Sequence, residues 1–328
     1  MFGNSRKNNE YFMFRRWNKS STAQQIGSLD EKLTSSTDSL IRFSKSDHSV
    51  SQSNSGVSGQ VEIYLNKRLN CYYAVKRYNK RENHETKQEY IDRILHEYNI
   101  LQQLSHFNII KVYHYKVSLS GNVKLYLEAG SSNLYILLRN NKLIHQSEIF
   151  CIWRQILLGL NYLHSIDICH RDLKLQNIVL DLNFGIVKII DFVTSFKSIN
   201  HEFALGLVGS ENYSSPEQFS QISYDGFKSD IWSLAVCLYQ LATRKLPWKS
   251  ARFNDPGYIK YCNHDFHPED LLKILPQGKQ LVTQMFDIDP ENRISTISII
   301  NNPWIKTIKY CNGLDNCGFD HLKLINNQ

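Results

Sequence analysis

Apolar and polar positions divide the chain into a polar N-terminal stretch and two regions with different periodicity. Residues 1–50 are rich in Ser, Thr, Asn and Lys and show little apolar periodicity, which predicts a disordered tail. Within residues 51–128, apolar residues at helical spacing predict one helix over about 87–104. Alternating or continuous apolar residues predict four strands in the same region, around 61–65, 71–76, 111–117 and 123–128.

Residues 129–308 are predicted to be mainly helical. Apolar residues over 149–163 recur in steps of three and one, which places them on one face of a helix. Residues 230–242 are apolar on all sides, as expected for a central buried helix. Two short strands are expected at 177–180 and 187–190, joined by a turn at 183–185. The pattern therefore predicts an α+β chain with a small β-rich lobe and a larger helical lobe, followed by a polar tail over 309–328.

The most informative motif is residues 170–177, His-Arg-Asp-Leu-Lys-Leu-Gln-Asn. Asp172 can accept a hydroxyl proton, Lys174 can meet a phosphate, and Asn177 can hold a metal ion, which are the functions that phosphoryl transfer needs. Asp191 follows in an Asp-Phe-Val triplet, where a second metal ligand would lie. This spacing resembles that of the eukaryotic-type protein kinases, and Lys174 points to their serine/threonine branch.

The resemblance implies a bilobal α+β protein kinase fold that uses ATP and Mg²⁺ and transfers the γ-phosphoryl group to Ser or Thr hydroxyls of protein substrates. Asp172 would orient and deprotonate the substrate hydroxyl, and Lys174 would stabilise the transferring phosphate. Asn177 and Asp191 would bind Mg²⁺, which bridges the phosphates and offsets their charge. The transition state is loose, so positioning and electrostatics would account for the catalysis.

Residues 54–61 resemble the kinase glycine loop, with Asn54 in place of its first glycine. Lys76, in the sequence Tyr-Ala-Val-Lys, would hold the α- and β-phosphates. A buried lysine without a partner is costly, so Glu97 of the predicted helix, rather than Glu89, is expected to pair with it. The residues implied to contact the nucleotide are Gly56, Gly59, Val61, Lys76, Glu97 and, through the hinge backbone, Glu128 and Gly130.

Two further segments resemble the kinase large lobe. Residues 209–217 are similar to the end of an activation segment, with Ser-Pro-Glu for Ala-Pro-Glu, and Glu217 should form a buried ion pair with Arg293. Asp230 should hold the backbone of the catalytic loop from the start of the central helix. The resemblance covers about residues 54–308.

The chain departs from the family pattern at Val193, where the kinases have glycine. A β-branched residue resists backbone angles that glycine permits, so we expect a less mobile metal-binding loop. Loss of the metal is not expected, because Asp191 remains. Together with Asn54, Val193 leaves open a pseudokinase that binds nucleotide or partners without catalysis. A small-molecule kinase fits less well, because such enzymes of this fold generally lack the Ser-Pro-Glu segment.

Arg171 precedes the catalytic aspartate, and in this family such an arginine often receives an activation-loop phosphate. Residues 206–208, Gly-Leu-Val, cannot be phosphorylated, and the hydroxyl residues lie further back, within 194–198. We therefore predict activity without loop phosphorylation, with Glu202 as a candidate substitute for the phosphate. Strong selection for arginine in the substrate is not expected, because the aligned positions carry Asn133, Gln176 and Gln240.

Composition limits the partners. The 38 basic and 31 acidic residues give a net charge of +7, without the dense basic block of a nucleic-acid-binding arm. No stretch reaches about 18 apolar residues, so no membrane span is expected. The seven cysteines form no Cys-x-x-Cys pair, and most lie in apolar runs, as free thiols of a reducing compartment would. Cys311 and Cys317 could chelate a metal or pair with each other.

A finer resemblance concerns residues 246–252 and 208–213, which are similar to the fungal kinases that regulate nutrient and potassium transporters, the nitrogen-permease-reactivator and halotolerance group. This resemblance implies a cytoplasmic kinase that acts on the stability or trafficking of membrane transporters. We also expect the protein to be a monomer.

Overall fold

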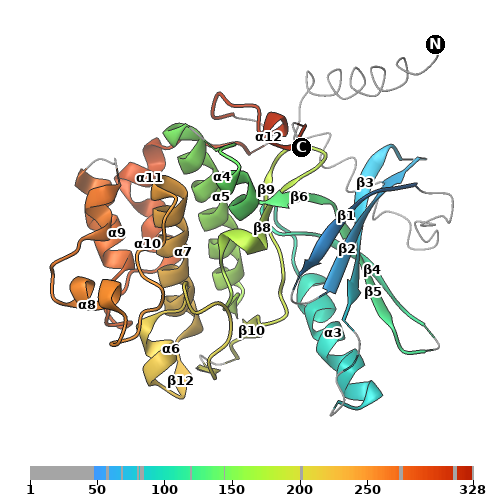
Figure 1. The fold of residues 1–328 in the computed structure, drawn as a ribbon, viewed down its shortest axis with the longest axis horizontal. Coiled ribbons are helices and arrows are strands. Elements are labelled where there is room, and N and C mark those ends of the chain that lie inside the picture. The colour runs from blue at the N-terminus through green and yellow to red at the C-terminus, as the bar shows by residue number, and fades with distance from the viewer. Residues whose placement is uncertain are drawn as a thin grey trace.

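The computed structural model describes residues 48–56, 59–67, 69–79, 81, 85–118, 120–143, 145–199, 202–272, 276–312 and 316–326. The predicted N-terminal tail lies outside the described residues except at its end, where strand β1 begins at His48. Val57 and Ser58 of the predicted glycine loop also lie outside them. Figure 1 shows a β-rich lobe with one long helix beside a larger, mainly helical lobe, as the sequence predicts.

The small lobe is built on a five-stranded antiparallel sheet in the order β1-β2-β3-β5-β4. Its strands are β1 (His48–Gly56), β2 (Gly59–Asn66), β3 (Cys71–Tyr78), β4 (Val112–Val117) and β5 (Val123–Glu128). Along β5, Val123, Leu125 and Leu127 are buried and alternate with less buried residues, so one face of this strand covers the core. All four predicted strands are present. Strand β1 was not predicted, because its Ser- and Asn-rich sequence lacks apolar alternation.

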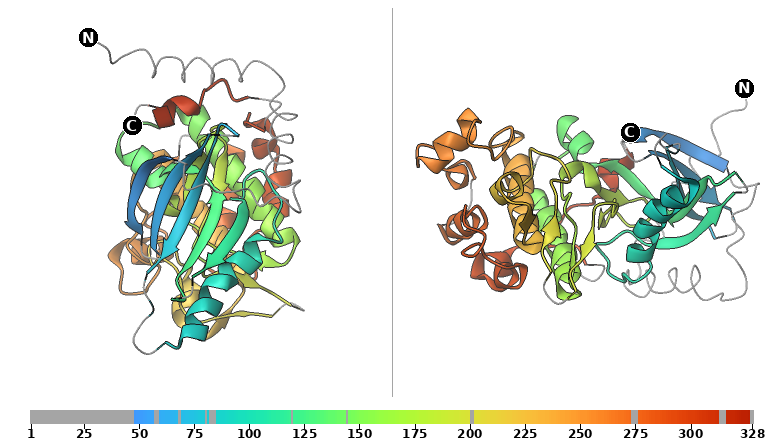
Figure 2. Two further views of the ribbon diagram at one scale, coloured as in Figure 1. Left: turned by 90° about the vertical axis from the view of Figure 1, so that its right-hand side faces the viewer. Right: turned by 90° about the horizontal axis from the view of Figure 1, so that it is seen from below.

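Helix α3 (Lys87–Leu101) packs beside this sheet, as the two views of Figure 2 show. It begins with a capping box: the Glu89 N–H donates to Thr86 Oγ1 at 3.2 Å, and the Thr86 N–H donates to the Glu89 carboxylate at 2.7 Å. The helix ends three residues before the predicted Leu104. That leucine still packs on the core from the turn that follows, which is why the apolar spacing runs past the helix.

The large lobe is organised around two long helices, α5 (Gln146–Ser165) and α7 (Gly226–Thr243). Helix α7 is buried along nearly its whole length, which confirms the predicted central helix. The other elements are β6 (Gly130–Asn133), α4 (Leu134–Arg139), β7 (Ile168–Cys169), η1 (Leu175–Asn177), β8 (Ile178–Asp181), β9 (Val187–Ile189), β10 (Phe196–Lys197), β11 (Ala204–Leu205), α6 (Pro216–Ser220), β12 (Ser223–Tyr224), α8 (Pro256–Cys262), η2 (Pro268–Leu271), α9 (Pro276–Met285), α10 (Thr296–Asn301), α11 (Pro303–Thr307) and α12 (Leu322–Asn326).

The C-terminal residues differ from the predicted polar tail. Their described part includes helix α12, and His321 and Leu324 are buried. Local composition could not reveal this, because the contacts that bury them lie far away in the sequence, as at Gly185 of the β8–β9 turn. Among the described residues, no helix is both long and apolar enough to cross a membrane.

Candidate active site

The predicted catalytic residues lie in the loop between β7 and β8, whose backbone is held by helix α7. Asp230, at the start of α7, accepts hydrogen bonds from the backbone N–H of His170 at 2.7 Å and of Arg171 at 2.8 Å. Arg171 adopts a φ of 67°, a left-handed conformation that is unfavourable for a non-glycine residue. The two hydrogen bonds to the buried Asp230 carboxylate offset that strain. The predicted contact between Asp230 and the catalytic loop is therefore present.

Asp172 lies at the centre of this loop, with its two carboxylate oxygens in different environments. Oδ2 accepts hydrogen bonds from Lys174 Nζ at 2.6 Å and from Asn177 Nδ2 at 3.0 Å. Oδ1 is buried and has no hydrogen-bond partner among the residues that the structure describes. A buried acceptor without a donor is costly, and a hydroxyl group from a bound molecule would relieve that cost. Lys174 Nζ also donates to Ser210 Oγ at 2.8 Å, which links the loop to the segment that precedes α6.

A buried lysine joins strand β3 to helix α3 and to the second aspartate. Lys76 Nζ donates to both Glu97 oxygens, at 2.9 and 2.8 Å, so the predicted Lys76–Glu97 pair is confirmed. The same ammonium lies 3.2 Å from Asp191 Oδ1. Burial alone would lower the pKa of Lys76, but the Glu97 and Asp191 carboxylates raise it. Burial would raise the pKa of Asp191, but the Lys76 ammonium outweighs it and lowers that pKa. Lys76 and Asp191 are therefore both charged at neutral pH.

Asn177 and Asp191 fit a hard divalent cation. The Asn177 amide nitrogen donates to the backbone oxygen of Asp172 at 2.9 Å and to its carboxylate at 3.0 Å, which leaves Oδ1 as the amide atom for a metal ion. Asp191 has a φ of 66° and turns its carboxylate toward Lys76. Carboxylate and amide oxygens are the ligands that Mg²⁺ takes in phosphate sites. The donor set therefore suits magnesium.

The predicted glycine-loop residues lie on the β1–β2 hairpin. Gly56 pairs with Gly59, and Val61 pairs with Lys76 across β2 and β3. Gly59 has a φ of 150°, and a Cβ there would lie 2.2 Å from the carbonyl oxygen of Arg77. Glycine at this position is therefore required by close strand packing, whatever its role toward phosphates.

The predicted hinge joins β5 to β6. The Glu128 side chain pairs with Lys188 at 2.8 Å, and the Glu128 backbone N–H donates to the Lys111 carbonyl oxygen at 2.9 Å. A contact of Glu128 with adenine would therefore have to use its backbone carbonyl oxygen. A Cβ at Gly130 would lie 2.4 Å from Val179 Cγ2, so only glycine allows β6 to approach β8 this closely.

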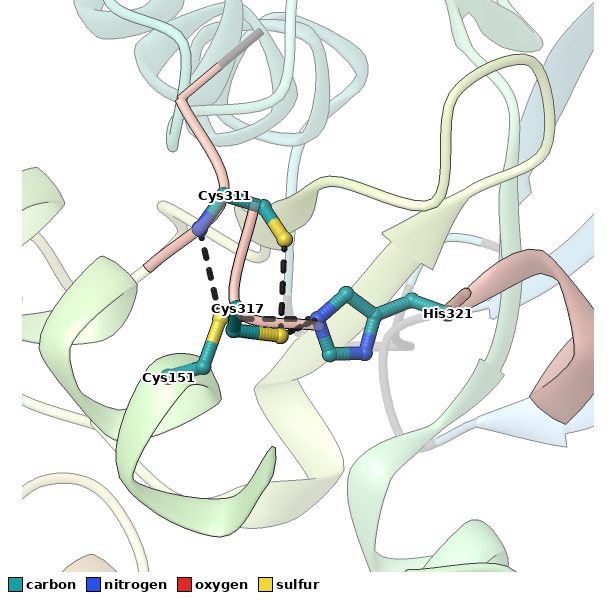
Figure 3. A group of neighbouring side chains, drawn as sticks. All are labelled: Cys151, Cys311, Cys317 and His321. Carbon is teal, nitrogen blue, oxygen red and sulfur yellow. Dashed lines mark hydrogen bonds between the residues drawn. The ribbon is translucent and has the colours of Figure 1, made fainter. Parts of the chain in front are cut away.

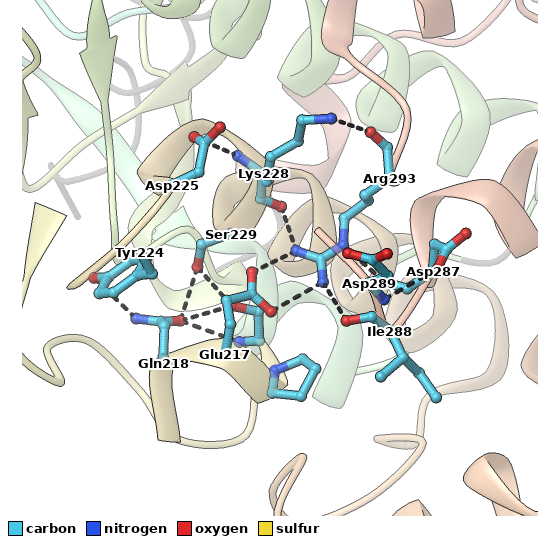
Figure 4. Close-up of polar contacts among 12 residues, drawn as sticks. Glu217, Gln218, Tyr224, Asp225, Lys228, Ser229, Asp287, Ile288, Asp289 and Arg293 are labelled. Carbon is cyan, nitrogen blue, oxygen red and sulfur yellow. Dashed lines mark hydrogen bonds and ion pairs between the residues drawn. The ribbon is translucent and has the colours of Figure 1, made fainter. Parts of the chain in front are cut away.

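A second buried ion pair fixes the segment that ends at α6. Arg293 donates to the two Glu217 oxygens at 2.6 and 3.0 Å, which confirms the predicted pair (Figure 4). The same guanidinium donates to the backbone oxygens of Asp287 at 2.9 Å and Lys228 at 2.8 Å. The pair thus ties α6, α7 and the turn before Arg293 together.

Comparison with known proteins agrees with this geometry. The family model described as "Protein kinase domain" matches residues 50–305. The chain belongs to the protein kinase family. The chain is 31% identical over 305 residues to the nitrogen permease reactivator protein of Saccharomyces cerevisiae, covering 78% of this chain and 38% of that protein.

Two more kinases are similar over comparable lengths. Serine/threonine-protein kinase oca2 of Schizosaccharomyces pombe is 28% identical, with 78% of this chain and 48% of that protein covered. Serine/threonine-protein kinase HAL4/SAT4 of Saccharomyces cerevisiae is 31% identical, with 73% and 41% covered. The chain therefore spans less than half the length of each of these curated relatives.

The kinase signature departs from the family at Val193, and the backbone there accommodates the substitution. The positive φ in this triplet belongs to Asp191, at 66°, and Val193 is not among the described residues with positive φ. A β-branched residue is strained mainly in that left-handed region, so valine fits this turn without the expected resistance. We predicted a less mobile metal-binding loop because valine would resist the backbone angles of glycine. The backbone conformation at Val193 does not support that prediction.

The kinase activation segment is held by neutral contacts at Arg171. Its guanidinium donates to Tyr224 Oη at 3.0 Å, to the backbone oxygen of Gly206 at 3.3 Å, and to that of Leu205. Glu202, suggested from the sequence as a substitute for a phosphate, is exposed and is not among these partners. In the folded chain, carbonyl and hydroxyl oxygens occupy the guanidinium of Arg171. The prediction that Glu202 takes the place of a phosphate at Arg171 is therefore wrong.

Two residues that the sequence did not single out support the kinase site. Tyr78 Oη donates to the Glu97 carboxylate, and His96 Nε2 lies 2.9 Å from the backbone oxygen of Ser195. Tyr78 is two positions after Lys76 on strand β3, and residues two apart on a strand lie on the same face. The sequence could therefore have indicated that Tyr78 lies beside Lys76. The contact of His96 joins α3 to the activation segment and had no local signal.

Proposed function

We propose that this chain transfers the γ-phosphoryl group of ATP to Ser and Thr hydroxyls of proteins, with Mg²⁺ as the metal. The observation that carries the proposal is the buried Oδ1 of Asp172, which has no hydrogen-bond partner in the described part of the chain, while Oδ2 is held by Lys174 and Asn177. This arrangement leaves one carboxylate oxygen to accept the proton of a substrate hydroxyl.

Each residue of the site has a role in this proposal. Asp172 orients the hydroxyl and takes its proton, and Lys174 moves from Asp172 toward the transferring phosphate as charge develops there. Lys76, kept in place by Glu97, binds the α- and β-phosphates, while Asn177 and Asp191 hold the metal. Bound Mg²⁺ would neutralise phosphate charge. The glycine residues Gly56 and Gly59, Val61, and the backbone of Glu128 and Gly130 complete the nucleotide site.

We propose further that activity does not depend on phosphorylation of the activation segment. Arg171 already has three oxygen partners. The Ser195 hydroxyl is buried and contacts the His170 carbonyl oxygen at 3.4 Å, and the buried Ser198 hydroxyl donates to the Glu202 carbonyl oxygen at 2.9 Å. Replacing Thr194, Ser195 and Ser198 together by Ala should leave phosphate transfer within a few-fold of wild type. A complete loss of transfer in a folded triple variant would contradict this part of the proposal.

The substrate groove is proposed to lack strong selection for arginine. Gln176 Oε1 and Gln240 Oε1 both accept hydrogen bonds from Tyr213 Oη, and Asn133 Oδ1 caps helix α4. These amide side chains carry no negative charge, so they offer no carboxylate to a basic peptide. Their oxygens are also already hydrogen-bonded within the protein. A peptide array should show no strong preference for arginine near the acceptor residue, and a strong preference would refute this.

The substrates are proposed to include membrane transporters or proteins that regulate them, at a cytoplasmic location. The support is the similarity to the nitrogen permease reactivator protein, together with the resemblance in residues 246–252.

The first experiment measures phosphate transfer from labelled ATP with Mg²⁺ or Mn²⁺. Acceptors are a generic protein, the chain itself and the cytosolic segments of nutrient and potassium transporters. Asp172→Asn should reduce transfer by about 10²–10⁴-fold, because the base is lost while the shape is kept. Asp167→Asn, the same change at an exposed position nearby, is the matched control. If folded wild-type protein binds nucleotide but transfers no phosphate with either metal, the pseudokinase alternative replaces the proposal.

A further inference from the structure

Four side chains with metal-binding atoms meet on the large lobe, and none of them belongs to the catalytic motif. Cys151 comes from helix α5, and Cys311, Cys317 and His321 come from the C-terminal segment (Figure 3). Their three sulfur atoms and one ring nitrogen all lie within 4.8 Å of one another. Cys151 and His321 are buried, and the other two are partly buried. The cluster therefore brings together one helix and a segment that begins 160 residues later.

The distances within the cluster match a tetrahedral metal site. The sulfurs of Cys311 and Cys317 are 3.6 Å apart, and His321 Nε2 lies 3.4 Å from the sulfurs of both Cys151 and Cys317. Zinc–sulfur bonds of 2.3 Å at tetrahedral angles place ligand atoms about 3.7 Å apart. Thiolate and imidazole ligands in a four-coordinate arrangement are typical of zinc.

The surroundings of the cluster orient its ligands. His321 turns Nε2 toward the sulfurs, and its buried Nδ1 lies 3.3 Å from the Glu148 carboxylate, close enough for an ion pair but not aligned as a hydrogen bond. A carboxylate on the far nitrogen of a metal-bound histidine fixes the ring and its tautomer. The Cys151 sulfur accepts hydrogen bonds from the Gln155 amide at 3.4 Å and from the Cys311 backbone N–H at 3.3 Å. Such donors stabilise a thiolate, which is the form that binds zinc.

The segment that carries three of the ligands also packs on elements near the active site. Arg154 of α5 donates to the backbone oxygen of Ile308 and lies over the Tyr310 ring, 4.3 Å from its centroid. A Cβ at Gly185, in the β8–β9 turn, would lie 3.2 Å from His321 Cβ. Strand β8 follows directly on the catalytic loop, so the segment lies against the structure that supports this loop.

We propose that Cys151, Cys311, Cys317 and His321 bind one structural Zn²⁺ ion, which fastens the C-terminal segment to helix α5. Four protein ligands leave no open position for water or substrate, so the ion has no catalytic role. Three of the ligands are contributed by a short segment, and among the described residues of 309–326 Leu324 is the one buried apolar side chain. Metal binding therefore contributes much of the free energy that keeps this segment folded on the large lobe.

The test uses the full chain, expressed with zinc in the medium and purified without chelators. Elemental analysis should find about one zinc per chain, and Cys317→Ser should lose it. His321→Cys should keep the ion, because four cysteines also form a structural zinc site, whereas His321→Leu should not. Cys262→Ser changes another partly buried cysteine outside the cluster and should retain full zinc content.

Wild-type protein supplies a second measurement that does not depend on whether the variants fold. Removing zinc with a chelator should lower Tm by about 5 °C or more and make residues 309–326 sensitive to protease. Adding Co²⁺ should restore the resistance and give the visible absorption of a tetrahedral thiolate site. Three results would each overturn the proposal: zinc below about 0.1 per chain with no Co²⁺ spectrum, iron in place of zinc, or a native mass lower by two hydrogens, which indicates a disulfide.

Discussion

The buried ion pairs Lys76–Glu97 and Glu217–Arg293 differ in what surrounds them. Lys76–Glu97 joins a strand to a helix in the small lobe, and its ammonium has a third acceptor, Asp191, whose side chain is 25% exposed. Glu217–Arg293 lies in the large lobe, where the Arg293 side chain is 0% exposed. All five guanidinium N–H groups of Arg293 have acceptors, two from Glu217 and three from backbone carbonyl oxygens.

This difference determines which of the two cations, Lys76 or Arg293, can exchange one of its acceptors for a ligand. Every donor of Arg293 is used within the protein, so nothing is left for a ligand and the pair serves stability. One donor of Lys76 points at a partly exposed carboxylate that is itself proposed to bind metal. A phosphate could replace that carboxylate as the acceptor without leaving the lysine unpaired, because Glu97 stays. We infer that the first pair acts in binding and the second as a fixed anchor.

The largest expected effect comes from breaking the anchor. Glu217→Ala leaves the Arg293 charge buried without its carboxylate, and removal of one partner of such a pair costs about 3–5 kcal/mol. Urea or thermal unfolding should show this loss. Glu211→Ala removes an exposed carboxylate that pairs with Arg252 at 3.0 Å, and it should cost less than about 1 kcal/mol. Equal losses in the two variants would show that burial does not distinguish these pairs.

The next effect separates binding from stability. Lys76→Met should reduce kcat/KM for phosphate transfer by about 10²–10³-fold, because a charged donor to the phosphates is lost. Nucleotide affinity and kcat, measured together with the unfolding free energy, show where the change acts. Lys197→Met, at an exposed lysine that donates to Gln103 Oε1 at 3.2 Å, is the control and should retain activity. A Lys76→Met protein with normal transfer would remove the proposed role of this pair.

The smallest effect tests the departure from the family. Because Val193 is not in a positive-φ conformation, Val193→Gly should change transfer by no more than a few-fold. It should lower stability by about 0.4–1 kcal/mol, since glycine gives the unfolded chain more freedom. Denaturant midpoints and initial rates, measured side by side, test both. A large gain in activity would mean that valine restrains the metal loop after all.

Much of the kinase site could be predicted because its signals are local. The motif at 170–177 places Asp172, Lys174 and Asn177 within eight residues. The pairs Lys76–Glu97 and Glu217–Arg293 followed from motifs with known spacing. Strand β1 could not be predicted, since its polar residues take their extended form from pairing with β2. Glu202 was wrong as the partner of Arg171, because backbone carbonyl oxygens, which have no sequence signature, lie closer.

Short-range spacing and periodicity were enough to identify the kinase family and the division into two lobes, and to predict the catalytic residues. Tertiary structure alone decided the surroundings of Asp172 Oδ1, the neutral contacts of Arg171 and the meeting of Cys151 with Cys311, Cys317 and His321. Each depends on atoms brought together across long stretches of chain, and packing rather than local propensity determines which of those atoms meet.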